Sequence, residues 1–528
     1  MGPSLLVPLP FEAGKKGELC FFAAGVLAHV GETPTIAVQL YGFDSPKGEC
    51  ADRVFVDVPV VASGAMSATR ELPRPSPPNV KEGLPLFGPA MAFQKDPIGF
   101  LRRCQRKHGD VFTVNLLLFK ATFVLGPEEQ RRWFTARPEV LDFFTATVEA
   151  TQALIGELSR FQRFSMHLDA VNAVIRLGLM KTERVNVYLD AIRRVARQRF
   201  EAWVDAPRID LFHETSAMIN QINIEALLGA DTWAKHGETI ANAYYDLEFN
   251  GIKPEAVAFP NFPSPAVRRC KRARDRVDAI MHELVAERSA SPSNDYISLW
   301  LTQTPLDGEA PDVAELAAHL LGLFFAAHTN TTGTFAWTVA NLAARPDLFE
   351  RASAECDAHA KRHGESPPYP ALRELDFLDA CMRESVRLSF AVLLIRRALV
   401  PYGAGDFCVP EGQRVCVAPI VTHLDPAVYE DPERFNPDRF SDLSEARQLE
   451  REGTYVQFGL GAHRCLGEMF ANAVLRAAWC IFFRDYEIEL EDSELPPHDF
   501  TKTLGTAYPT RPVWARVRHR DRAPVQDT

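Results

Sequence analysis

The stretch that decides the fold is Phe458-Gly459-Leu460-Gly461-Ala462-His463-Arg464-Cys465-Leu466-Gly467, which surrounds one cysteine with glycines and basic side chains. A thiolate that binds a metal accepts backbone N–H hydrogen bonds close to its sulfur, and glycine allows the backbone to come that near. Gly461 and Gly467 occupy the places where this approach is expected. The pattern is typical of a thiolate bound to a haem iron, so we predict that Cys465 is the axial ligand of haem b.

Two more side chains of the same loop have predicted roles at this site. We expect Phe458 to cover the sulfur of Cys465 and exclude water, and His463 to reach a haem propionate. The simpler interpretation is a free cysteine in a turn. It does not explain why phenylalanine, glycine, cysteine and glycine stand together at these fixed offsets.

The loop resembles the cysteine-ligand loop of the cytochrome P450 haem-thiolate monooxygenases, Phe-x-x-Gly-x-Arg/His-x-Cys-x-Gly. The resemblance implies a mainly α fold, in which a helix-rich haem domain carries small β-sheets. The family's Glu-x-x-Arg motif is matched by Glu384-Ser385-Val386-Arg387, within a predicted helix over residues 378–388. A spacing of three places Glu384 and Arg387 on one helical face, where the two charges can pair. Taken alone, this motif is usually a solvated helix pair.

A third family motif lies between these two. Residues 431–440 resemble the meander that precedes the ligand loop in cytochromes P450. By that resemblance Arg439, in Pro-x-Arg-Phe, pairs with Glu384 and Arg387, and Arg434 is the alternative. A carboxylate between two guanidinium groups forms a bidentate network, and the resemblance implies that this network scaffolds the haem pocket rather than taking part in the chemistry.

The helix that crosses the haem is predicted over residues 313–345, and its centre, residues 320–334, is apolar for two turns and then abruptly polar. A uniformly buried helix gives no reason for this change. The family's Ala/Gly-Gly/Ala-x-x-Thr segment aligns with residues 326–330. The resemblance implies that Ala327 leaves space for dioxygen above the iron.

Asn330 stands where the family usually has the threonine that helps to deliver protons to bound oxygen. Thr329 and Thr331 are alternatives only if the register slips, and a slip of one residue rotates a helical side chain by about 100°. A purely structural interpretation is that Asn330 hydrogen-bonds within a kinked helix. We therefore expect polar contacts from Asn330 to bound oxygen or water.

The segment around this asparagine, together with residues 387–396 and 423–429, resembles one branch of the family, which holds the cholesterol and oxysterol hydroxylases and prostacyclin synthase, near the sterol demethylases. The same alignment implies that Arg396 binds a haem propionate, with Arg397 as the alternative. The family's Trp-x-x-x-Arg is missing from residues 167–179, where Arg176 is the basic candidate. The aromatic signature of the sterol demethylases is not recognisable either, so we do not assign that activity.

Composition limits the partners. The chain has 528 residues, of which 46% are hydrophobic, enough to bury a substantial core. Its net charge of −11 argues against a nucleic-acid partner. Ten cysteines without paired spacing favour a reduced, intracellular setting. Residues 20–28 are too short an apolar run to span a bilayer, so we expect no transmembrane anchor and a cytoplasmic or peripherally membrane-bound protein.

Three parts are expected along the chain. Residues 1–70 form a β-rich extension of unassigned role, residues 71–89 a proline-rich connector, and residues 90–528 the haem domain. Within these parts we predict a helix over 97–108 and strands over 35–41, 53–60, 111–118, 121–125, 395–399 and 414–417.

The resemblance implies a monooxygenase that takes electrons from a ferredoxin or a diflavin reductase and inserts oxygen into an apolar substrate, such as a sterol, lipid or terpenoid. Residues 141–157, 244–263 and 324–327 are the expected pocket walls. An isomerase or dehydratase acting on a lipid peroxide is the alternative, because Asn330 does not distinguish the two. A haem protein that only binds or senses a ligand is a third possibility. Analogy with the family favours the monooxygenase.

Overall fold

The computed structural model describes three N-terminal strands and most of the chain from residue 74 to residue 521. The described ranges are 20–28, 35–43, 50–59, 74–81, 88–116, 119–156, 159, 168–253, 256–257, 259–302, 312–461, 464–503 and 505–521. The chain divides into two compact units, Met1–Pro73 and Arg74–Thr528.

The N-terminal unit contains an antiparallel sheet of three strands in the order β1-β2-β3. These strands are β1 (Cys20–Ala28), β2 (Thr35–Phe43) and β3 (Cys50–Pro59). Cys20 lies opposite Phe43, and Thr35 lies opposite both Ala28 and Pro59. The predicted strands over 35–41 and 53–60 lie within or overlap β2 and β3, and the apolar run 20–28 forms the third strand.

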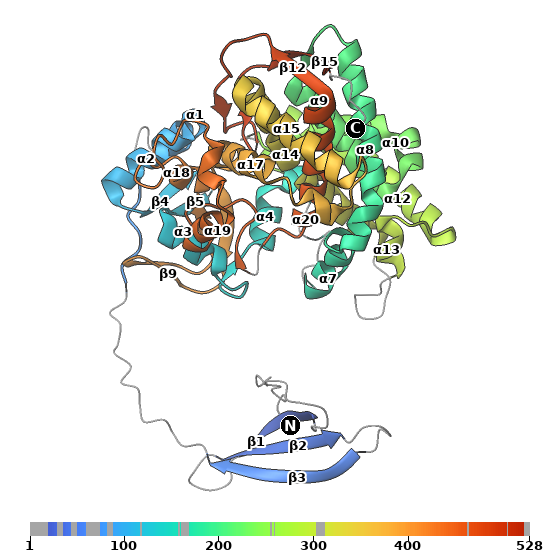
Figure 1. Ribbon diagram of the computed structural model, residues 1–528. Coiled ribbons are helices and arrows are strands. Elements are labelled where there is room, and N and C mark those ends of the chain that lie inside the picture. Colours follow the sequence, from blue (N-terminus) through green and yellow to red (C-terminus); the bar gives the residue numbers. More distant parts are fainter. Residues whose placement is uncertain are drawn as a thin grey trace. The chain divides into compact units, whose positions relative to one another are not determined.

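The larger unit is mainly helical. Figure 1 shows α14 in the middle of its helices. Its helices are α1 (Gly88–Lys95), α2 (Pro97–His108), α3 (Pro127–Thr135), α4 (Phe144–Ala150), α5 (Gln152–Ile155), α7 (Leu168–Leu179), α8 (Thr182–Asp205), α9 (Leu211–Leu228), α10 (Ala230–Gly251), α12 (Pro265–Ala290), α13 (Tyr296–Thr302), α14 (Val313–Ala343), α15 (Pro346–His363), α16 (Tyr369–Leu372), α17 (Asp376–Ser389), α18 (Pro419–His423), α19 (Leu443–Glu452), α20 (Glu468–Asp485) and the 3-10 helix η2 (Pro437–Phe440).

A five-stranded sheet lies beside the helices, in the order β4-β5-β11-β8-β6. Its strands are β4 (Val111–Leu116), β5 (Phe119–Val124), β6 (Leu141–Asp142), β8 (Leu394–Ala398) and β11 (Arg414–Val417). β5 and β11 are parallel, and the other neighbours are antiparallel. This sheet places Arg396 opposite Val415. At its edge, Asn79 bridges to Thr113, so residues of the predicted connector lie along β4.

The remaining described strands of the larger unit form three smaller sheets. They are β9 (Tyr402–Ala404) with β10 (Phe407–Val409), β7 (Ile209–Asp210) with β12 (Tyr486–Leu490) and β15 (Trp514–His519), and β13 (His498–Asp499) with β14 (Tyr508–Pro509). The small sheet of β13 and β14 carries Tyr508, which reaches the candidate site described below.

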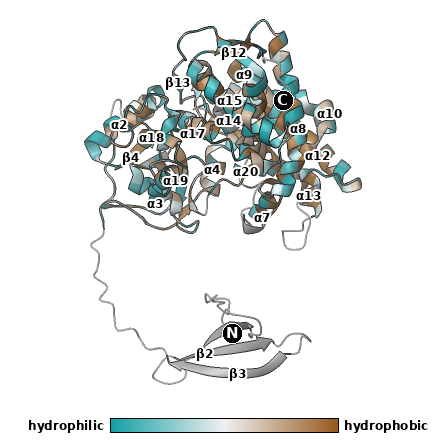
Figure 2. Cartoon of the chain, in the orientation of Figure 1, coloured by the Kyte–Doolittle hydropathy of each residue, from teal (hydrophilic) through white to brown (hydrophobic). Residues whose placement is uncertain are grey.

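The helix ends follow from local chemistry. Asp96 caps α2 by accepting the N–H of Gly99 at 2.9 Å, Pro97 opens the helix, and Gly109 follows its end at a φ of 81°. Asp312 caps α14 by accepting the N–H of Ala314 at 3.1 Å. Figure 2 shows hydrophobic and hydrophilic segments alternating along outer helices such as α8 and α12, as expected for helices that cover a core with one face.

The long helix α14 departs from this amphipathic pattern because it is buried on most sides. Ala326 and Asn330 are exposed, and Ala327 between them is half-buried. Residues four apart lie on the same face of a helix, so these residues form one accessible strip on an otherwise packed element. The strip is where the sequence predicts the change from apolar to polar.

Candidate functional site

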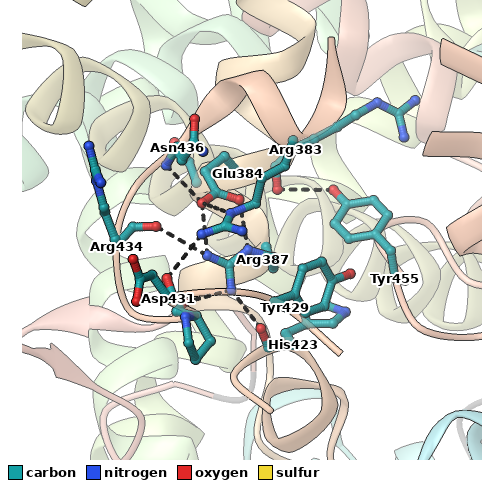
Figure 3. Close-up of polar contacts among 12 residues, drawn as sticks. Arg383, Glu384, Arg387, His423, Tyr429, Asp431, Arg434, Asn436 and Tyr455 are labelled. Atoms are coloured by element: carbon teal, nitrogen blue, oxygen red, sulfur yellow. Dashed lines mark hydrogen bonds and ion pairs between the residues drawn. The ribbon is translucent and has the colours of Figure 1, made fainter. Parts of the chain in front are cut away.

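A buried ion pair lies within α17. Glu384 and Arg387 are both fully buried. Arg387 Nε donates to Glu384 Oε2 at 2.7 Å, and Nη2 donates to Oε1 at 2.8 Å. Figure 3 shows the two side chains facing each other in this bidentate arrangement. A planar guanidinium matches a carboxylate in this geometry, and burial of either group without the other would be costly.

The remaining donors of Arg387 bind the last residue of α18 and the segment that follows it. Its Nη1 donates to the carbonyl oxygens of His423 at 2.6 Å and Pro432 at 2.7 Å. The guanidinium also lies 4.9 Å from the ring centroid of Tyr429. Burial lowers the pKa of His423 to about 3, so its ring is neutral, and its Nε2 accepts the N–H of Val456 at 3.1 Å. The network therefore reaches from α17 to the residues just before the cysteine loop.

The structure distinguishes the two arginines proposed as third partner. Arg439 Nε donates to Glu384 Oε1 at 3.4 Å, and its Nη2 donates to the carbonyl of Asp431 at 3.0 Å. Arg434 contributes only its backbone oxygen, 3.5 Å from Arg387 Nη2, and Figure 3 shows its side chain directed away. The backbone N–H of Asn436 also donates to Glu384 Oε1 at 2.9 Å. This partner could not be predicted from side-chain patterns in the sequence.

The cysteine loop folds back on itself around Cys465. The N–H of Cys465 donates to the carbonyl of Phe458 at 2.7 Å. Gly461 has a φ of 64°, which favours glycine, and a Cβ there would lie 3.4 Å from the backbone of Thr135. Gly467 has a φ of −93°, and a Cβ there would lie 3.8 Å from the Cys465 sulfur, an ordinary contact. Glycine is thus needed for conformation at 461 rather than for close approach at 467.

His463 lies outside the described residues, so its predicted contact with a propionate stays a prediction. Phe458 is half-buried in the same loop and supplies the backbone acceptor for Cys465. Gly459 shares the left-handed conformation of Gly461, with a φ of 74°. Two left-handed glycines give the loop the tight path that brings Phe458 and Cys465 together.

Cys465 is the exposed member of the eight cysteines whose side chains the structure describes. Its residue surface is accessible, while the protein around the sulfur still desolvates it and raises the pKa of the thiol. The backbone N–H groups of Gly467 and Glu468 lie near the sulfur and oppose that shift. An exposed cysteine with backbone N–H groups near its sulfur fits the chemistry of a metal-bound thiolate, which loses its proton when the metal binds.

Arg396 is a buried cation on β8 without a carboxylate partner in the described parts of the chain. Its guanidinium lies 4.0 Å from the ring centroid of Trp133, Nη1 donates to the carbonyl of Trp133, and Nε has no hydrogen-bond partner among the described residues. Burial lowers its pKa to about 10. Arg397, the alternative, is paired with Glu149 at 2.7 Å. Arg396 therefore fits a carboxylate of a bound group, such as a haem propionate.

Asn330 binds the C-terminal loop through its amide oxygen. Oδ1 accepts the N–H of Thr506 at 3.0 Å and the hydroxyl of Thr506 at 3.3 Å. Gly505 is packed so closely that a Cβ on it would lie 2.3 Å from the same oxygen. Among the described residues no partner holds Nδ2, so the amide NH2 is the free donor on the accessible strip of α14.

A second buried carboxylate, Glu248 on α10, faces α14 and was not found from the sequence. Glu248 Oε1 accepts the hydroxyl of Thr329 at 2.9 Å and that of Tyr508 at 3.4 Å. Its Oε2 lies 3.4 Å from His328 Nδ1, and His328 Nε2 lies 3.0 Å from the hydroxyl of Ser216 on α9. Hydrogen-bonding groups thus run from the half-buried Ser216 to the residue next to Asn330. We call Glu248, His328, Thr329, Tyr508 and Ser216 the Glu248 cluster.

The predicted pocket walls meet α14 through aromatic side chains. Tyr244 on α10 packs against Phe324 with ring centroids 5.9 Å apart, and its hydroxyl donates to the carbonyl of Leu321 at 3.1 Å.

Arg176 is exposed on α7. Across the described helices, none combines the length and the apolar character that crossing a membrane demands.

The chain is similar in sequence to known proteins over most of its length. A sequence model described as Cytochrome P450 matches residues 77–513. A sterol 14-demethylase of Arabidopsis thaliana is 29% identical over 429 residues, covering 78% of this chain and 86% of the relative. The cytochrome P450 monooxygenase pynD of Aspergillus niger is 30% identical over 447 residues, covering 82% and 88%. A lanosterol 14-alpha demethylase of Mus musculus is 28% identical over 455 residues, covering 85% and 88%.

A solved structure shares the fold. It is described as retinoic acid bound cyanobacterial CYP120A1 and superposes with a TM-score of 0.71 at 20% identity. The superposition covers 85% of this chain and all of that chain. The helical body and the small sheets beside it are therefore a known arrangement.

Proposed function

The chain belongs to the cytochrome P450 family and is an oxygen-incorporating oxidoreductase, and we propose that it is a haem-thiolate monooxygenase acting on an apolar substrate of sterol, lipid or terpenoid type. The predicted family, fold class and enzyme class are confirmed. The observation that carries the proposal is the exposed Cys465, which is held by its N–H bond to Phe458 in a loop with two left-handed glycines, next to the buried Glu384 network.

The residues present fit haem b. Cys465 is proposed as the axial thiolate, Arg396 as the partner of one propionate, and His463 as a second propionate contact. When bound, the haem iron activates dioxygen with electrons from a redox protein, and the thiolate favours O–O cleavage. The Glu384 network acts as a scaffold, since every one of its charges is already satisfied by protein.

The Glu248 cluster is proposed to hold and pass protons. A carboxylate, an imidazole and hydroxyls can all exchange protons, and they are linked in the order Ser216, His328, Glu248, Thr329. Thr329 ends this series beside Asn330, whose free amide NH2 can orient oxygen or water on the accessible strip. The carboxylate of this series, Glu248, is supplied by α10. Residues 326–331 of α14 include no carboxylate of their own.

The substrate class is supported by the relatives and by the aromatic walls. Two of the relatives named above are sterol 14-demethylases, and Phe324 of α14 packs against Tyr244 of α10, both within the predicted pocket walls. The electron donor is proposed to be a ferredoxin or a diflavin reductase, which would meet basic side chains near the cysteine loop. Arg464 is exposed there and pairs with Glu468 at 2.6 Å.

The proposal is tested by the spectrum and by oxygen transfer. The reduced carbon monoxide complex of the purified protein should have the strongly red-shifted Soret band of thiolate ligation. Cys465→Ala should abolish this band, whereas Cys408→Ala, a half-buried cysteine on β10, should leave it unchanged. Sterols, fatty acids and terpenes are then screened for a Soret shift, and product from a binding substrate should carry an atom of labelled dioxygen. Conversion of a lipid peroxide by the unreduced enzyme without oxygen uptake would contradict the monooxygenase.

A further inference from the structure

Two phenylalanine side chains are exposed in the segment between α10 and α12. Phe259 is 52% exposed and Phe262 is 65% exposed, although the large apolar side chains of this unit are mostly buried. Single exposed apolar residues are common on protein surfaces, but two aromatic rings only three residues apart form a local apolar patch. Neither ring belongs to the polar networks described above.

These two residues are fixed to the start of α12 by hydrogen bonds. The N–H of Phe262 donates to the carbonyl of Phe259 at 2.9 Å, which closes a turn. The side chain of Ser264 then caps α12. Arg268 Nη1 donates to the carbonyl of Pro263 at 2.6 Å. The apolar patch therefore lies next to the first turns of α12.

One face of α12 is strongly cationic, and Figure 1 shows this helix at the edge of the helical body. Successive residues of an α-helix are rotated by about 100°, so four exposed arginines fall within one sector of about 100°. We call them the arginine face, which consists of Arg268, Arg269, Arg272 and Arg276. Buried residues of α12 such as Cys270 and Val277 lie on the other side of the helix.

The protein leaves most of this positive charge unpaired. Arg269, Arg272 and Arg276 have no hydrogen-bond or ion-pair partner among the residues that the structure describes. Asp275, at the edge of the same sector, is paired with Lys271 at 3.0 Å. The first turn of α12 has no acidic residue, and cations near the start of a helix oppose its dipole. The stability of α12 therefore does not explain the arginine face.

We propose that Phe259, Phe262 and the arginine face form a docking surface for an anionic membrane. The two rings enter the apolar edge of the bilayer, and the guanidinium groups bind the phosphates of anionic lipids, whose geometry suits their paired donors. One apolar element alone binds a bilayer weakly and reversibly. A basic patch beside it supplies the second signal that stable binding requires.

A membrane fits this surface better than a nucleic acid or an acidic protein does. All three carry the negative charge that arginines attract. The two exposed rings also require an apolar partner, and a bilayer offers one directly beneath its phosphates. The chain as a whole has a net charge of −11, which repels an anionic polymer, whereas a membrane needs to meet only the cationic face.

The test measures how much of the full-length purified protein sediments with vesicles. One set of vesicles contains equal parts of phosphatidylglycerol and phosphatidylcholine, and the other contains phosphatidylcholine alone. We expect binding to the anionic vesicles that is at least about tenfold tighter than to the neutral ones, and release at about 0.5 M salt. Equal binding to both sets, no binding to either, or tighter binding to duplex DNA would overturn the proposal.

A triple variant tests the arginine face. Replacing Arg269, Arg272 and Arg276 by glutamine removes three charges and retains side chains that favour a helix. Each basic side chain near an anionic surface strengthens binding about fivefold, so this variant should bind anionic vesicles at least about tenfold more weakly. The matched control replaces three exposed arginines elsewhere by glutamine and should bind like the unaltered protein; these are Arg447, Arg451 and Arg516. Equal losses in both variants would show that only the net charge matters, against the proposal.

A single substitution tests the apolar patch. Phe262→Ser should weaken binding to the anionic vesicles about tenfold, because one ring no longer leaves water. Met91→Ser is the control, since Met91 is 62% exposed on α1, and it should bind as before. Circular dichroism should be unchanged in every variant, which separates lost binding from lost folding. A Phe262→Ser protein that still binds as tightly as the unaltered one would refute insertion into the bilayer.

Discussion

Glu384 and Glu248 are both buried carboxylates, 0% and 3% exposed, yet their partners differ in kind. Glu384 is held by the guanidinium groups of Arg387 and Arg439 and by a backbone N–H. Glu248 is held by two hydroxyls and an imidazole. A guanidinium stays protonated in proteins, whereas hydroxyls and imidazole can both give and take protons. One carboxylate is therefore fixed in charge, and the other stands in a series of groups that can pass a proton.

Their surroundings in the fold agree with this difference. Arg387 binds the carbonyls of His423, at the end of α18, and of Pro432, and the ring of His423 accepts the N–H of Val456 before the cysteine loop, so the Glu384 network holds elements together. Glu248 instead contacts α14 at Thr329, beside the accessible Asn330. If this comparison is right, damage to the first network should reduce folding and haem retention. Damage to the second should reduce turnover in a protein that still folds.

The largest effect is expected at Arg387. Removing it leaves the Glu384 carboxylate buried without its bidentate partner, which typically costs about 3–5 kcal/mol. Arg387→Ala should therefore give protein with little haem and a strongly lowered midpoint of urea unfolding. Haem content per chain and the unfolding midpoint are the measurements. Arg439→Ala should be milder, because its bond to Glu384 is longer, at 3.4 Å.

Arg434→Ala is the matched control, since only the backbone of Arg434 faces the network. The variant keeps that carbonyl and should retain haem and stability close to the unaltered protein. Equal losses in Arg434→Ala and Arg387→Ala would show that this segment responds to any change of charge, and the comparison between the two carboxylates would fail.

The second largest effect is expected at Glu248, on the rate of substrate oxidation. Glu248→Gln keeps the size of the side chain but removes its ability to accept and release a proton. A positioned proton-transfer group typically contributes about 10²-fold or more, so substrate oxidation should fall by about that factor, with a larger solvent isotope effect and a normal carbon monoxide spectrum. Glu225→Gln is the control, because Glu225 is a buried carboxylate on α9 bound to Arg194 and Gln221. Equal losses in both variants would mean that Glu248 is only structural.

The sequence predicts much of the Glu384 network and little of the Glu248 cluster. Glu384 and Arg387 are three residues apart on one helix, and their motif is short enough to read directly. The strand that carries Arg396 and the helix that carries Asn330 also agree with their predicted ranges, since β8 covers residues 394–398 and α14 covers residues 313–343.

The Glu248 cluster could not be found in this way, because its members are brought together by packing alone. Glu248 lies 81 residues before Thr329, and Tyr508 lies 260 residues after Glu248. The polar residues His328 and Thr329 inside an apolar helix were the visible signal that a buried partner exists. Which helix supplies that partner depends on how α10 and α14 cross, and no local pattern encodes the crossing.

The smallest effect is expected at Asn330. It is measured as the fraction of consumed electrons that forms product rather than hydrogen peroxide, and it tests whether Asn330 belongs with Glu248 or with Glu384. Asn330→Leu keeps similar volume but removes the donor on the accessible strip and the acceptor for Thr506. One lost hydrogen bond is worth about 1 kcal/mol, which is about a fivefold change in the partition between product and hydrogen peroxide. Thr506→Val is the matched control, because it retains the N–H bond to Asn330 and removes only the longer hydroxyl contact. The ratio of peroxide to product per electron consumed should rise in Asn330→Leu and change little in Thr506→Val, while haem content stays constant in both. A loss of haem in Asn330→Leu would instead place Asn330 with Glu384 among the structural residues.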